Sequence, residues 1–410
     1  MPLPEDRQPH DSSRPPVLSG VRILDMATFL AAPFAATLCA DLGAEVVKLE
    51  LPSGVDPLRS LAPVKGDLPI HSKVSNRGKL GITLDVRKPD GRAVFLRLLP
   101  SFDVLVENFR TGTLDSWGLD LRTLHAANPR LIVLRVTGFG QTGPYARRPG
   151  FARIFEAMSG FANLIGEPDG SPQHMNYALG DMIAGLFGAF SITAALVEHS
   201  RCPQAPGREI DLSATEAMLR LLETLPAEFE QLGIVRQRSG ARATYTAPSN
   251  IYKTADGTWV TIVASSDAIF RRICCAMERQ DLLQDPRFAT LQLRVEHLQA
   301  IDSEVAAWCA SQPFDAIARG LAQNEVPFNK VNSIADVFEE PQFRARNAIV
   351  RMEDPDLGSL PAPCVVPRYS GSACAVPRSG PGVGEHTEYV LERLGIPRAE
   401  LDQLRAVGAI

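Results

Sequence analysis

The chain has 410 residues, of which 42 are basic and 47 acidic, and its formal net charge is −5. A chain of this length exceeds one ordinary core, so we expect two domains with an amply buried interior. Because neither sign of charge forms a long run, the composition argues against a nucleic-acid-binding protein. The seven cysteines are scattered and form no CxxC or Cys/His pair, which is typical of reduced thiols in the cytoplasm, and the histidines have no ligand-like spacing, so no metal site is predicted.

Two stretches resemble targeting or membrane segments. Residues 1–17 are rich in proline and charge, and no apolar run follows the start, so we interpret them as a disordered tail and not as a signal peptide. Residues 182–197 carry no charged side chain but are shorter than a membrane span requires, so a buried core helix is expected there. The sequence therefore predicts a cytoplasmic protein without a membrane partner.

From residue 21 onward the hydrophobic pattern alternates between strand-like and helix-like segments. Strand-like runs occupy residues 21–26, 45–50, 79–86, 103–109 and 131–140. Helical runs between them occupy residues 33–44, 92–102 and 114–129. Strands that alternate with helices imply crossover connections, and the pattern predicts an α/β fold with a Rossmann-like parallel sheet covered by helices.

The character of the chain changes after residue 222. Residues 251–264 are typical of two antiparallel strands joined by a turn at Ala255-Asp256-Gly257, and helical runs follow at 267–277 and 304–323. We therefore predict three parts after the tail. These are the N-terminal part of a large domain at 18–222, a smaller α+β domain at 223–334, and a segment returning to the large domain at 335–410.

A glycine-rich segment follows the last strand-like run of the large domain. Gly138-Phe139-Gly140-Gln141-Thr142-Gly143 satisfies the pattern GxGxxG, yet Pro144 comes next and no apolar-periodic helix opens. A dinucleotide fingerprint needs that helix, and it belongs to the first strand–helix turn, which lacks the pattern here. We therefore predict no nicotinamide or flavin cofactor, and interpret the segment as a glycine turn that lets the backbone pass close to a ligand or strand.

Asp181 follows Gly180 at the start of the long apolar run, and it has two interpretations. Aspartate is a favoured N-cap residue, and capping alone would explain it. The same position also suits a reactive carboxylate. A helix N-terminus keeps the charge ionised at neutral pH, and apolar surroundings exclude the water that would blunt a nucleophile.

Two polar segments precede Asp181 at predicted strand ends. Asn76-Arg77-Gly78-Lys79 precedes one strand, and Glu107-Asn108-Phe109-Arg110 ends another. Side chains at strand ends face the crevice where α/β sheets bind ligands, and there a lysine or arginine can pair with phosphates while a phenylalanine stacks on adenine. The alternative for both is an ordinary solvated loop.

The order of these segments resembles the family III CoA-transferases, the group that contains formyl-CoA and carnitine CoA-transferases and also α-methylacyl-CoA racemase. The resemblance covers nearly the whole chain from Leu18 to Ile410. It rests on ILDMATFLAAPFAATLCADLGAEVVKLE, NRGKLGITLDV, LVENFRTGTLDSWGLD, NPRLIVLRVTGFGQTGPYARRPGF, EAMSGFANLIGEPDGSP with ALGDMIAGLFGA, VPFNKVNSIADVFEEPQFRARN and GPGVGEHTEYVLERLGI.

The resemblance implies a set of site residues and an assembly. Asp181 matches the family's aspartate nucleophile, and Lys79, Asn108 and Phe109 match positions that line its CoA site. On the same surface we expect further cationic contacts to CoA from Arg77, Arg110 and the pair Arg147-Arg148. Coenzyme A is then a substrate and no other cofactor is implied, while the assembly is a homodimer of two interlocked rings.

The resemblance also implies a mechanism, in which CoA moves from an acyl-CoA to a carboxylic acid through aspartyl anhydride and aspartyl-CoA thioester intermediates. Such intermediates hydrolyse readily, so water has to be excluded. Relatives use a mobile glycine loop for this. The corresponding segment here, residues 238–242, contains one glycine, Gly240, which puts its shielding role in question.

A second departure from the family bears on the reaction. The racemase branch has a histidine and an aspartate where this chain reads Phe151-Ala152-Arg153. Neither Phe151 nor Ala152 can transfer a proton, which disfavours a racemase, although a racemase and a non-catalytic CoA-binding protein stay as alternatives. We hypothesise that Arg153 binds the distal carboxylate of a dicarboxylic substrate, with succinyl-CoA as donor; the alternative is a surface arginine next to Glu156.

Overall fold

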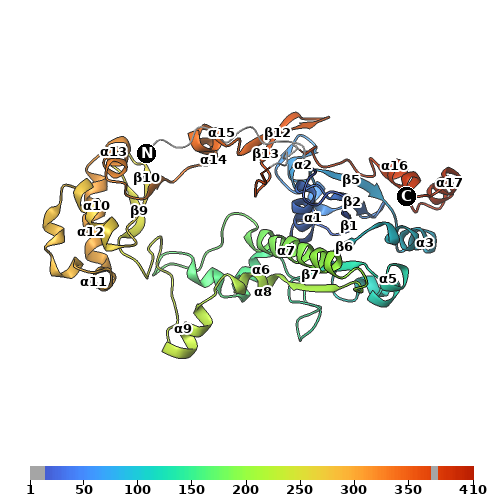
Figure 1. The fold of residues 1–410 in the computed structure, drawn as a ribbon, viewed down its shortest axis with the longest axis horizontal. Helices are drawn as coiled ribbons and strands as arrows, with labels where there is room; N and C mark the ends of the chain where they lie inside the picture. Colours follow the sequence, from blue (N-terminus) through green and yellow to red (C-terminus); the bar gives the residue numbers. More distant parts are fainter. Residues whose placement is uncertain (1–13, 371–376) are drawn as a thin grey trace. The chain divides into compact units, whose positions relative to one another are not determined.

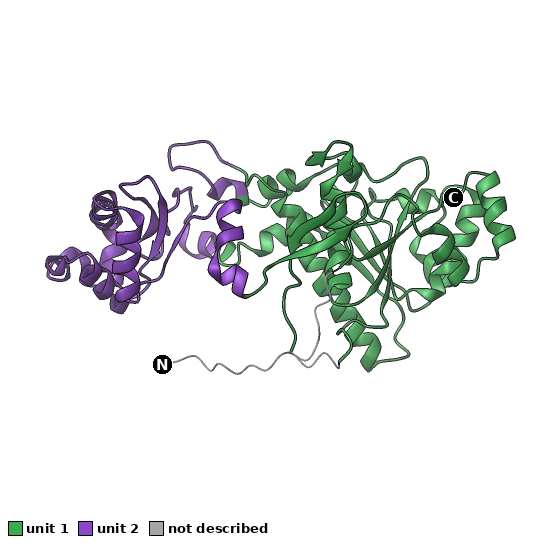
Figure 2. Ribbon diagram, turned by 90° about the horizontal axis from the view of Figure 1, so that it is seen from above, with its two compact units in different colours: residues 1–161, 174–227, 346–410 green, residues 162–173, 228–345 purple. Residues whose placement is uncertain are grey.

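The computed structural model describes residues 14–370 and 377–410, which form two compact units (Figure 2). Unit 1 takes its described residues from 1–161, 174–227 and 346–410, and unit 2 consists of 162–173 and 228–345. Most of the predicted tail lies outside the described residues. The boundaries predicted at 222 and 334 stay predictions about folding domains.

Unit 1 is built on a six-stranded sheet whose paired strands are all parallel, in the order β5-β2-β1-β6-β7-β8 (Figure 1). The strands are β1 (Arg22–Asp25), β2 (Glu45–Glu50), β5 (Lys79–Thr83), β6 (Val104–Glu107), β7 (Ile132–Thr137) and β8 (Glu209–Ser213). The predicted α/β class with a parallel central sheet is confirmed. The five strand-like runs of the sequence became β1, β2, β5, β6 and β7, while β8 was not predicted.

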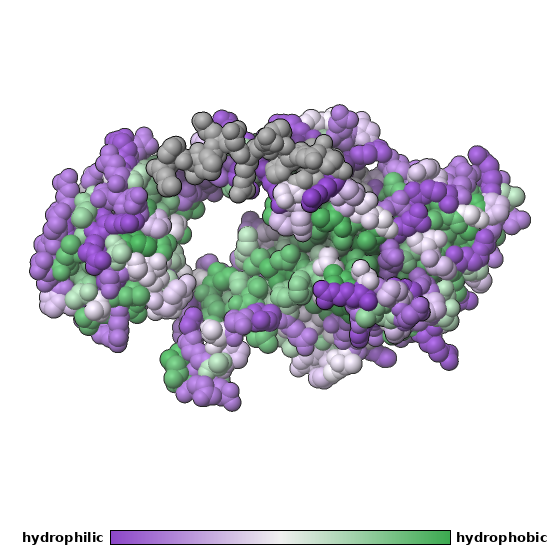
Figure 3. Space-filling view, in the orientation of Figure 1, coloured by the Kyte–Doolittle hydropathy of each residue, from purple (hydrophilic) through white to green (hydrophobic). Residues whose placement is uncertain are grey.

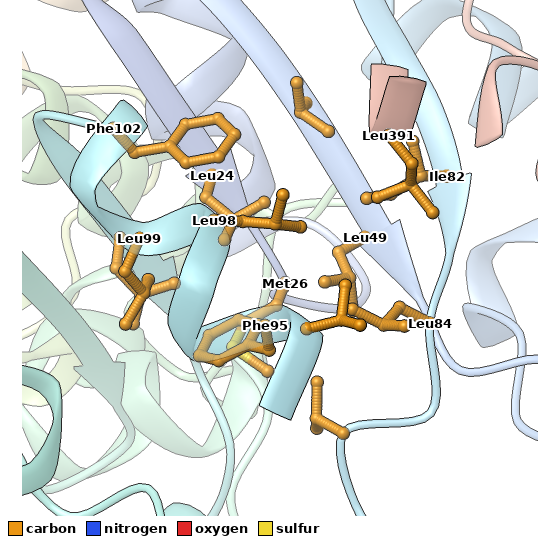
Figure 4. Packing of buried hydrophobic residues seen from close by; sticks show 14 of the residues in the cluster. Leu24, Met26, Leu49, Ile82, Leu84, Phe95, Leu98, Leu99, Phe102 and Leu391 are labelled. Atoms are coloured by element: carbon orange, nitrogen blue, oxygen red, sulfur yellow. The ribbon is translucent and has the colours of Figure 1, made fainter. Parts of the chain in front are cut away.

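Both faces of this sheet are buried, as expected for a parallel sheet. Alternate residues of a strand point to opposite faces, so Leu24 joins one apolar cluster and its neighbour Ile23 joins the other. The first cluster packs the sheet against Phe95 and Leu98 of helix α3 and Leu391 of α16 (Figure 4). Because helices cover both faces of the sheet, its inner strands contain runs of consecutive apolar residues.

The helices of unit 1 lie in the connections between the strands and in the C-terminal segment, and they cover these two faces. They are α1 (Ala31–Asp41), α2 (Ile70–Ser75), α3 (Pro89–Leu98), α4 (Thr113–Ser116), α5 (Leu121–Ala127), α6 (Ala152–Met158), α7 (Leu179–Arg201), α8 (Ala214–Arg220), α16 (Thr387–Arg393) and α17 (Arg398–Ala406). The hairpins β3 (Val64–Lys65)–β4 (Leu68–Pro69) and β12 (Ile349–Asp354)–β13 (Gly358–Pro363) complete the unit. The single helix predicted at 114–129 is two helices, α4 and α5, because Gly118 between them takes a left-handed φ of 73°.

The long apolar run forms helix α7, and the prediction that this helix is buried is wrong for the single chain. One face packs on α1 through Ala184 and Ile192, but Leu186 and Phe190 are 55% and 68% exposed. Figure 3 shows apolar side chains gathered over α7 on the visible face. Among the described residues α7 is the one helix with the length and composition to cross a membrane, although this test is also met by core helices of soluble proteins.

Unit 2 contains a three-stranded antiparallel sheet in the order β11-β10-β9, with helices packed against it. The strands are β9 (Ser249–Lys253), β10 (Trp259–Val263) and β11 (Phe328–Lys330), and the helices are α10 (Asp267–Ala276), α11 (Leu291–Glu296), α12 (Leu298–Ala310), α13 (Phe314–Gln323), α14 (Ile334–Glu339) and α15 (Pro341–Ala345), with α9 (Leu225–Leu232) at the junction of the two units. The predicted hairpin is confirmed as β9–β10. The helix predicted at 304–323 is divided between α12 and α13, because Pro313 cannot continue a helix.

Candidate active site

A pocket of about 210 Å³ lies in unit 1 at the carboxyl ends of β1, β6 and β7. Its lining includes Thr28 after β1, Asn108 after β6, Gly138 after β7, and Asp181 in the first turn of α7. Strand β1 pairs with β2 on one side and with β6 on the other, so the strand order changes direction here. Ligands of open α/β sheets bind at this kind of switch point.

The pocket depends on a close approach of α1 and α7. A Cβ atom added at Gly185 would lie 2.6 Å from the carbonyl oxygen of Ala31, and one added at Gly188 would lie 2.9 Å from the Cβ of Ala35. Only glycine fits at such distances. The small residues thereby bring the first turns of both helices to one pocket, where Ala31 and Asp181 both line the wall.

Asp181 does not cap its helix, so the N-cap interpretation is wrong. Helix α7 begins at Leu179 with Ala178 at the N-cap, and Asp181 is the third helical residue. Among the described residues none donates a hydrogen bond to, or forms an ion pair with, its carboxylate. Burial and the charge of Glu156 raise the pKa of Asp181 to about 6, so the carboxylate is still mostly ionised at neutral pH.

Glu156 of α6 is paired with the partly exposed side chain of His174, and the charge of Glu156 acts on Asp181. The carboxylate of Glu156 is fully buried, and its Oε2 lies 2.7 Å from His174 Nδ1. Its Oε1 accepts a hydrogen bond of 3.4 Å from the backbone N–H of Gly180, the residue before Asp181. No sequence motif marks the pair, because its members are 18 residues apart, one on α6 and the other in the segment before α7.

The segment Asn108-Phe109-Arg110 reaches the pocket as the sequence predicts. Asn108 binds the backbone of Thr28 twice: its Oδ1 accepts from the N–H at 2.8 Å, and its Nδ2 donates to the carbonyl oxygen at 2.7 Å. Phe109 lines the pocket and packs edge-on against Trp117, with 5.0 Å between ring centroids. Arg110 lines the pocket with an exposed side chain.

Arg77 and Lys79 are not brought into this pocket. Arg77 pairs with Asp41 at the end of α1. The Lys79 side chain is fully buried, and its Nζ lies 2.7 Å from Asp25 Oδ2. Lys79 also lines a second cavity of unit 1, of about 450 Å³, together with Gly380 and its neighbours. Burial lowers the pKa of Lys79 to about 8, against the attraction of Asp25.

The residues of the GPY…RPG segment are divided between the pocket and the surface. Phe151 lines the pocket, and its ring meets that of Phe29 edge-on, with 5.6 Å between the ring centroids. Arg148 also lines the pocket, and its Cζ lies 5.2 Å from the centroid of the Tyr145 ring. Arg153 is exposed on α6 and is not part of the lining. Arg153 thus lies on the surface, as the alternative interpretation expected, while the neighbouring Glu156 binds His174.

The glycine-poor segment 238–242 lies in unit 2. Gly240 takes a left-handed φ of 64°, and its N–H donates to the carbonyl oxygen of Gly166 at 2.9 Å. A shallow cavity within unit 2 is lined by Gly240, Arg242 and Glu167. The doubt about the shielding role of this segment, which rests on its single glycine, stays a prediction.

The sequence predicts neither a metal site nor disulfide bonds. In the described part of the chain, no group of three or more His, Cys, Asp or Glu side chains is placed to hold a metal ion. Six of the seven cysteines are described, all as free thiols, and Cys39, Cys274 and Cys309 are buried as packing residues. Cys374 lies outside the described residues.

The fold and this pocket define an α/β protein that holds a carboxylate without a partner among the described residues at the switch point of a parallel sheet, with two arginines lining the same pocket. The chain belongs to CoA-transferase family III, whose family model matches residues 18–387. It is an acyl-CoA:carboxylate CoA-transferase.

Named relatives and solved structures agree with this membership. The chain is 41% identical to succinyl-CoA–D-citramalate CoA-transferase of Chloroflexus aurantiacus, over 96% of this chain and 98% of the relative. It is 34% identical to succinate–glutarate CoA-transferase of Agrobacterium fabrum, over 93% and 96%. A crystal structure of a CAIB/BAIF family protein from Brucella suis has a TM-score of 0.81 at 32% identity, covering 93% of this chain and all of that one.

Proposed function

We propose that this enzyme transfers CoA from succinyl-CoA to a small dicarboxylic acid, with Asp181 as the covalent nucleophile. The observation that carries the proposal is the free carboxylate of Asp181 in the switch-point pocket, where no described side chain competes for it. The relatives support the substrate class, because their names give succinyl-CoA as donor and D-citramalate or L-malate as acceptor. Coenzyme A is then a substrate, and the proposal involves no further cofactor.

The reaction runs in four balanced steps through Asp181. The carboxylate attacks the thioester carbon, the C–S bond breaks, and a mixed anhydride and CoA thiolate result. The thiolate attacks Cγ of Asp181, which releases succinate and leaves an aspartyl-CoA thioester. An acceptor carboxylate displaces the thiolate from Cγ, and the thiolate then attacks the new acyl carbon. This last step regenerates Asp181 and gives the new acyl-CoA without a net proton change.

The pocket supplies what these steps need from the protein. Phe29 and Phe151 meet edge-on at the pocket, where their apolar rings would limit the access of water to the anhydride. Ala31 opens α1 on the same wall, and no described side chain caps that helix start. Backbone N–H groups of an uncapped helix start can therefore donate to the oxyanion that develops at each carbonyl.

The CoA contacts are proposed from the same wall. Phe109 and Arg110 lie at the pocket, and the exposed guanidinium of Arg110 is suited to a phosphate. The two hydrogen bonds from the Asn108 side chain to the backbone of Thr28 support a role for Asn108 in fixing the loop that meets the thioester. Arg77 and Lys79 would contact CoA only if their ion pairs with Asp41 and Asp25 opened, so we rank them below Phe109 and Arg110 as CoA contacts.

The distal carboxylate of the substrate needs a cation, and two arginines compete for that role. Arg153 was the sequence-based hypothesis, and its side chain is exposed on α6. Arg148 lines the Asp181 pocket. If Arg153→Ala leaves the apparent affinity for succinyl-CoA and its acceptor unchanged while Arg148→Ala weakens it, the Arg153 hypothesis fails.

We also propose a cytoplasmic homodimer. The support for the homodimer is the exposed apolar face of α7, which includes Leu186, Phe190 and Val197. A face of this kind on a helix rarely stays in contact with water in a soluble protein. Phe190→Glu should shift the molecular mass in solution from dimer to monomer, measured by light scattering. A wild-type protein that is monomeric at all concentrations would contradict the proposal.

The test of the function is a CoA-exchange screen with succinyl-CoA and a panel of small carboxylic acids. Wild-type enzyme should form a new acyl-CoA with at least one dicarboxylic acid, and Asp181→Ala should form none. Exchange of the α-proton with deuterated solvent in the absence of any acceptor would instead favour a racemase. CoA binding without turnover of any pair would favour a non-catalytic protein.

A further inference from the structure

The loop between β1 and α1, residues 27–30, has an unusual backbone for a wall of the Asp181 pocket. Phe29 takes a φ of 60°, in the left-handed region that large side chains rarely adopt. Thr28 and Phe29 both line the pocket, and Phe29 meets Phe151 edge-on. Strained residues of this kind persist only where surrounding groups fix them, and they cluster at functional sites.

Side chains form hydrogen bonds with five of the eight backbone polar groups of this loop, and most of these side chains come from distant parts of the chain. Asp25 Oδ1 accepts from the N–H of Ala27 at 3.1 Å, and Asn108 binds both backbone groups of Thr28. Lys48 Nζ donates to the carbonyl oxygen of Ala27. Asp56 Oδ1 accepts from the N–H of Phe29 at 2.9 Å.

Asp25, Lys48 and Asp56 belong, together with Lys79, to a buried network of charges. Lys48 Nζ lies 3.0 Å from Asp56 Oδ2, and both side chains are 1% exposed. Lys79 Nζ lies 2.7 Å from Asp25 Oδ2, with both side chains fully buried, and donates to the carbonyl oxygen of Pro33 at 2.8 Å. The network joins strands β1, β2 and β5 to one short loop.

Buried ion pairs are a poor source of stability, because the loss of hydration offsets their attraction. Four buried charges gathered on one loop are therefore better explained by the geometry they impose than by stability. Asp56 is suited to this, since the same Oδ1 atom accepts from Phe29 and from Leu58 and so ties the loop to the 3₁₀ turn Pro57–Arg59.

We propose that Lys48 and Asp56 are positioning residues that hold residues 27–30 in the conformation in which Thr28 and Phe29 form the acyl-binding wall of the Asp181 pocket. They touch no substrate and act through the backbone of Ala27 and Phe29. The catalytic part of this inference rests on the proposed function, whereas the hold on the loop does not.

The test uses the full-length enzyme with Lys48→Met, Asp56→Asn and the double variant. Lys73→Met is the matched control, because Lys73 is also a buried, ion-paired lysine of unit 1, but its Nζ binds Asp354 and Asp356 at 2.7 Å each and does not reach the loop. Four quantities are measured: kcat, KM for succinyl-CoA, the Kd of free CoA by calorimetry, and amide hydrogen exchange of peptides containing residues 27–30.

Lys48→Met should lower kcat on the order of 100-fold, because small displacements of a reacting group are costly. The Kd of CoA should change by less than about threefold, and the amides of Thr28 and Phe29 should exchange roughly tenfold faster or more as their hydrogen bonds open. Lys73→Met should leave kcat and these amides unchanged. The double variant removes the unpaired charge, so its urea midpoint should recover while its kcat stays low.

Two results would overturn the inference. If the loop amides exchange at the wild-type rate in Lys48→Met and Asp56→Asn, these residues do not hold the loop. If kcat recovers together with the urea midpoint in the double variant, their role is general stability. A wild-type enzyme without CoA transfer would refute the proposed function instead, and hydrogen exchange would still decide whether the loop is held.

Discussion

Replacing Asp181 by asparagine should abolish CoA transfer and at the same time stabilise the ligand-free protein. The pKa of Asp181 is raised from 3.8 to about 6, by burial first and by Glu156 second. A folded-state pKa above the unfolded value means that the native state binds the proton more tightly. The cost of the buried charge is therefore absent below about pH 4, grows between about pH 4 and pH 6, and is complete above that range.

The size of the effect follows from the shift, since one pKa unit corresponds to about 1.4 kcal/mol. Asp181→Asn should raise the free energy of unfolding by about 3 kcal/mol near pH 7.5 and by about 1.5 kcal/mol near pH 5. Urea-induced unfolding of both proteins at the two pH values measures this difference. Asp90→Asn is the control, because Asp90 is also a first-turn aspartate but is exposed on α3.

The control should show no comparable gain at either pH. If Asp181→Asn is neutral or destabilising near pH 7.5, the carboxylate is not held at a cost in the free protein. If the free energy of unfolding changes by the same amount at both pH values, the pKa of Asp181 is not raised. Either result would refute the reasoning that an unpartnered, partly buried charge is maintained for its reactivity.

Three further changes should act on the same pocket. Because Asp181 has to be ionised to attack, kcat/KM should fall below about pH 6. Glu156→Gln removes a neighbouring negative charge and should therefore move this acid limb of the pH profile to lower pH. An acid limb that does not move would contradict the interaction between Glu156 and Asp181. Arg148→Ala should raise KM for succinyl-CoA roughly tenfold with little change in kcat, as expected for loss of one charge-assisted contact, and an unchanged KM would exclude the contact. Gly185→Val would place side-chain atoms against the carbonyl oxygen of Ala31, so we expect lower stability and lower activity together, measured by urea midpoint and turnover.

The sheet and part of the site could be predicted because local patterns specify them. Apolar runs of strand length separated by helical runs predicted β1, β2, β5, β6 and β7. Asn108 and Phe109 were expected at the crevice because they end a parallel strand, and they line the pocket with Asp181. In each case the information lies within about ten neighbouring residues.

Features that depend on distant contacts could not be predicted. Lys79 looked like a free cation in NRGK, yet it pairs with Asp25, 54 residues earlier. Helix α7 begins two residues before Asp181, since its start is fixed by packing of Gly180 against the backbone of Ala152 and not by a capping side chain. Charge pairs and close backbone approaches leave no periodic signal in the sequence.

The covalent state of Asp181 tests the central claim most directly. Wild-type enzyme mixed with succinyl-CoA, quenched rapidly and digested should give a peptide around Asp181 whose mass is increased by that of CoA less one water. Hydroxylamine should convert this adduct to a hydroxamate at Asp181, and Asp181→Asn should give neither product. If wild-type enzyme transfers CoA at full rate while the peptide remains unmodified and resists hydroxylamine, Asp181 is not the nucleophile.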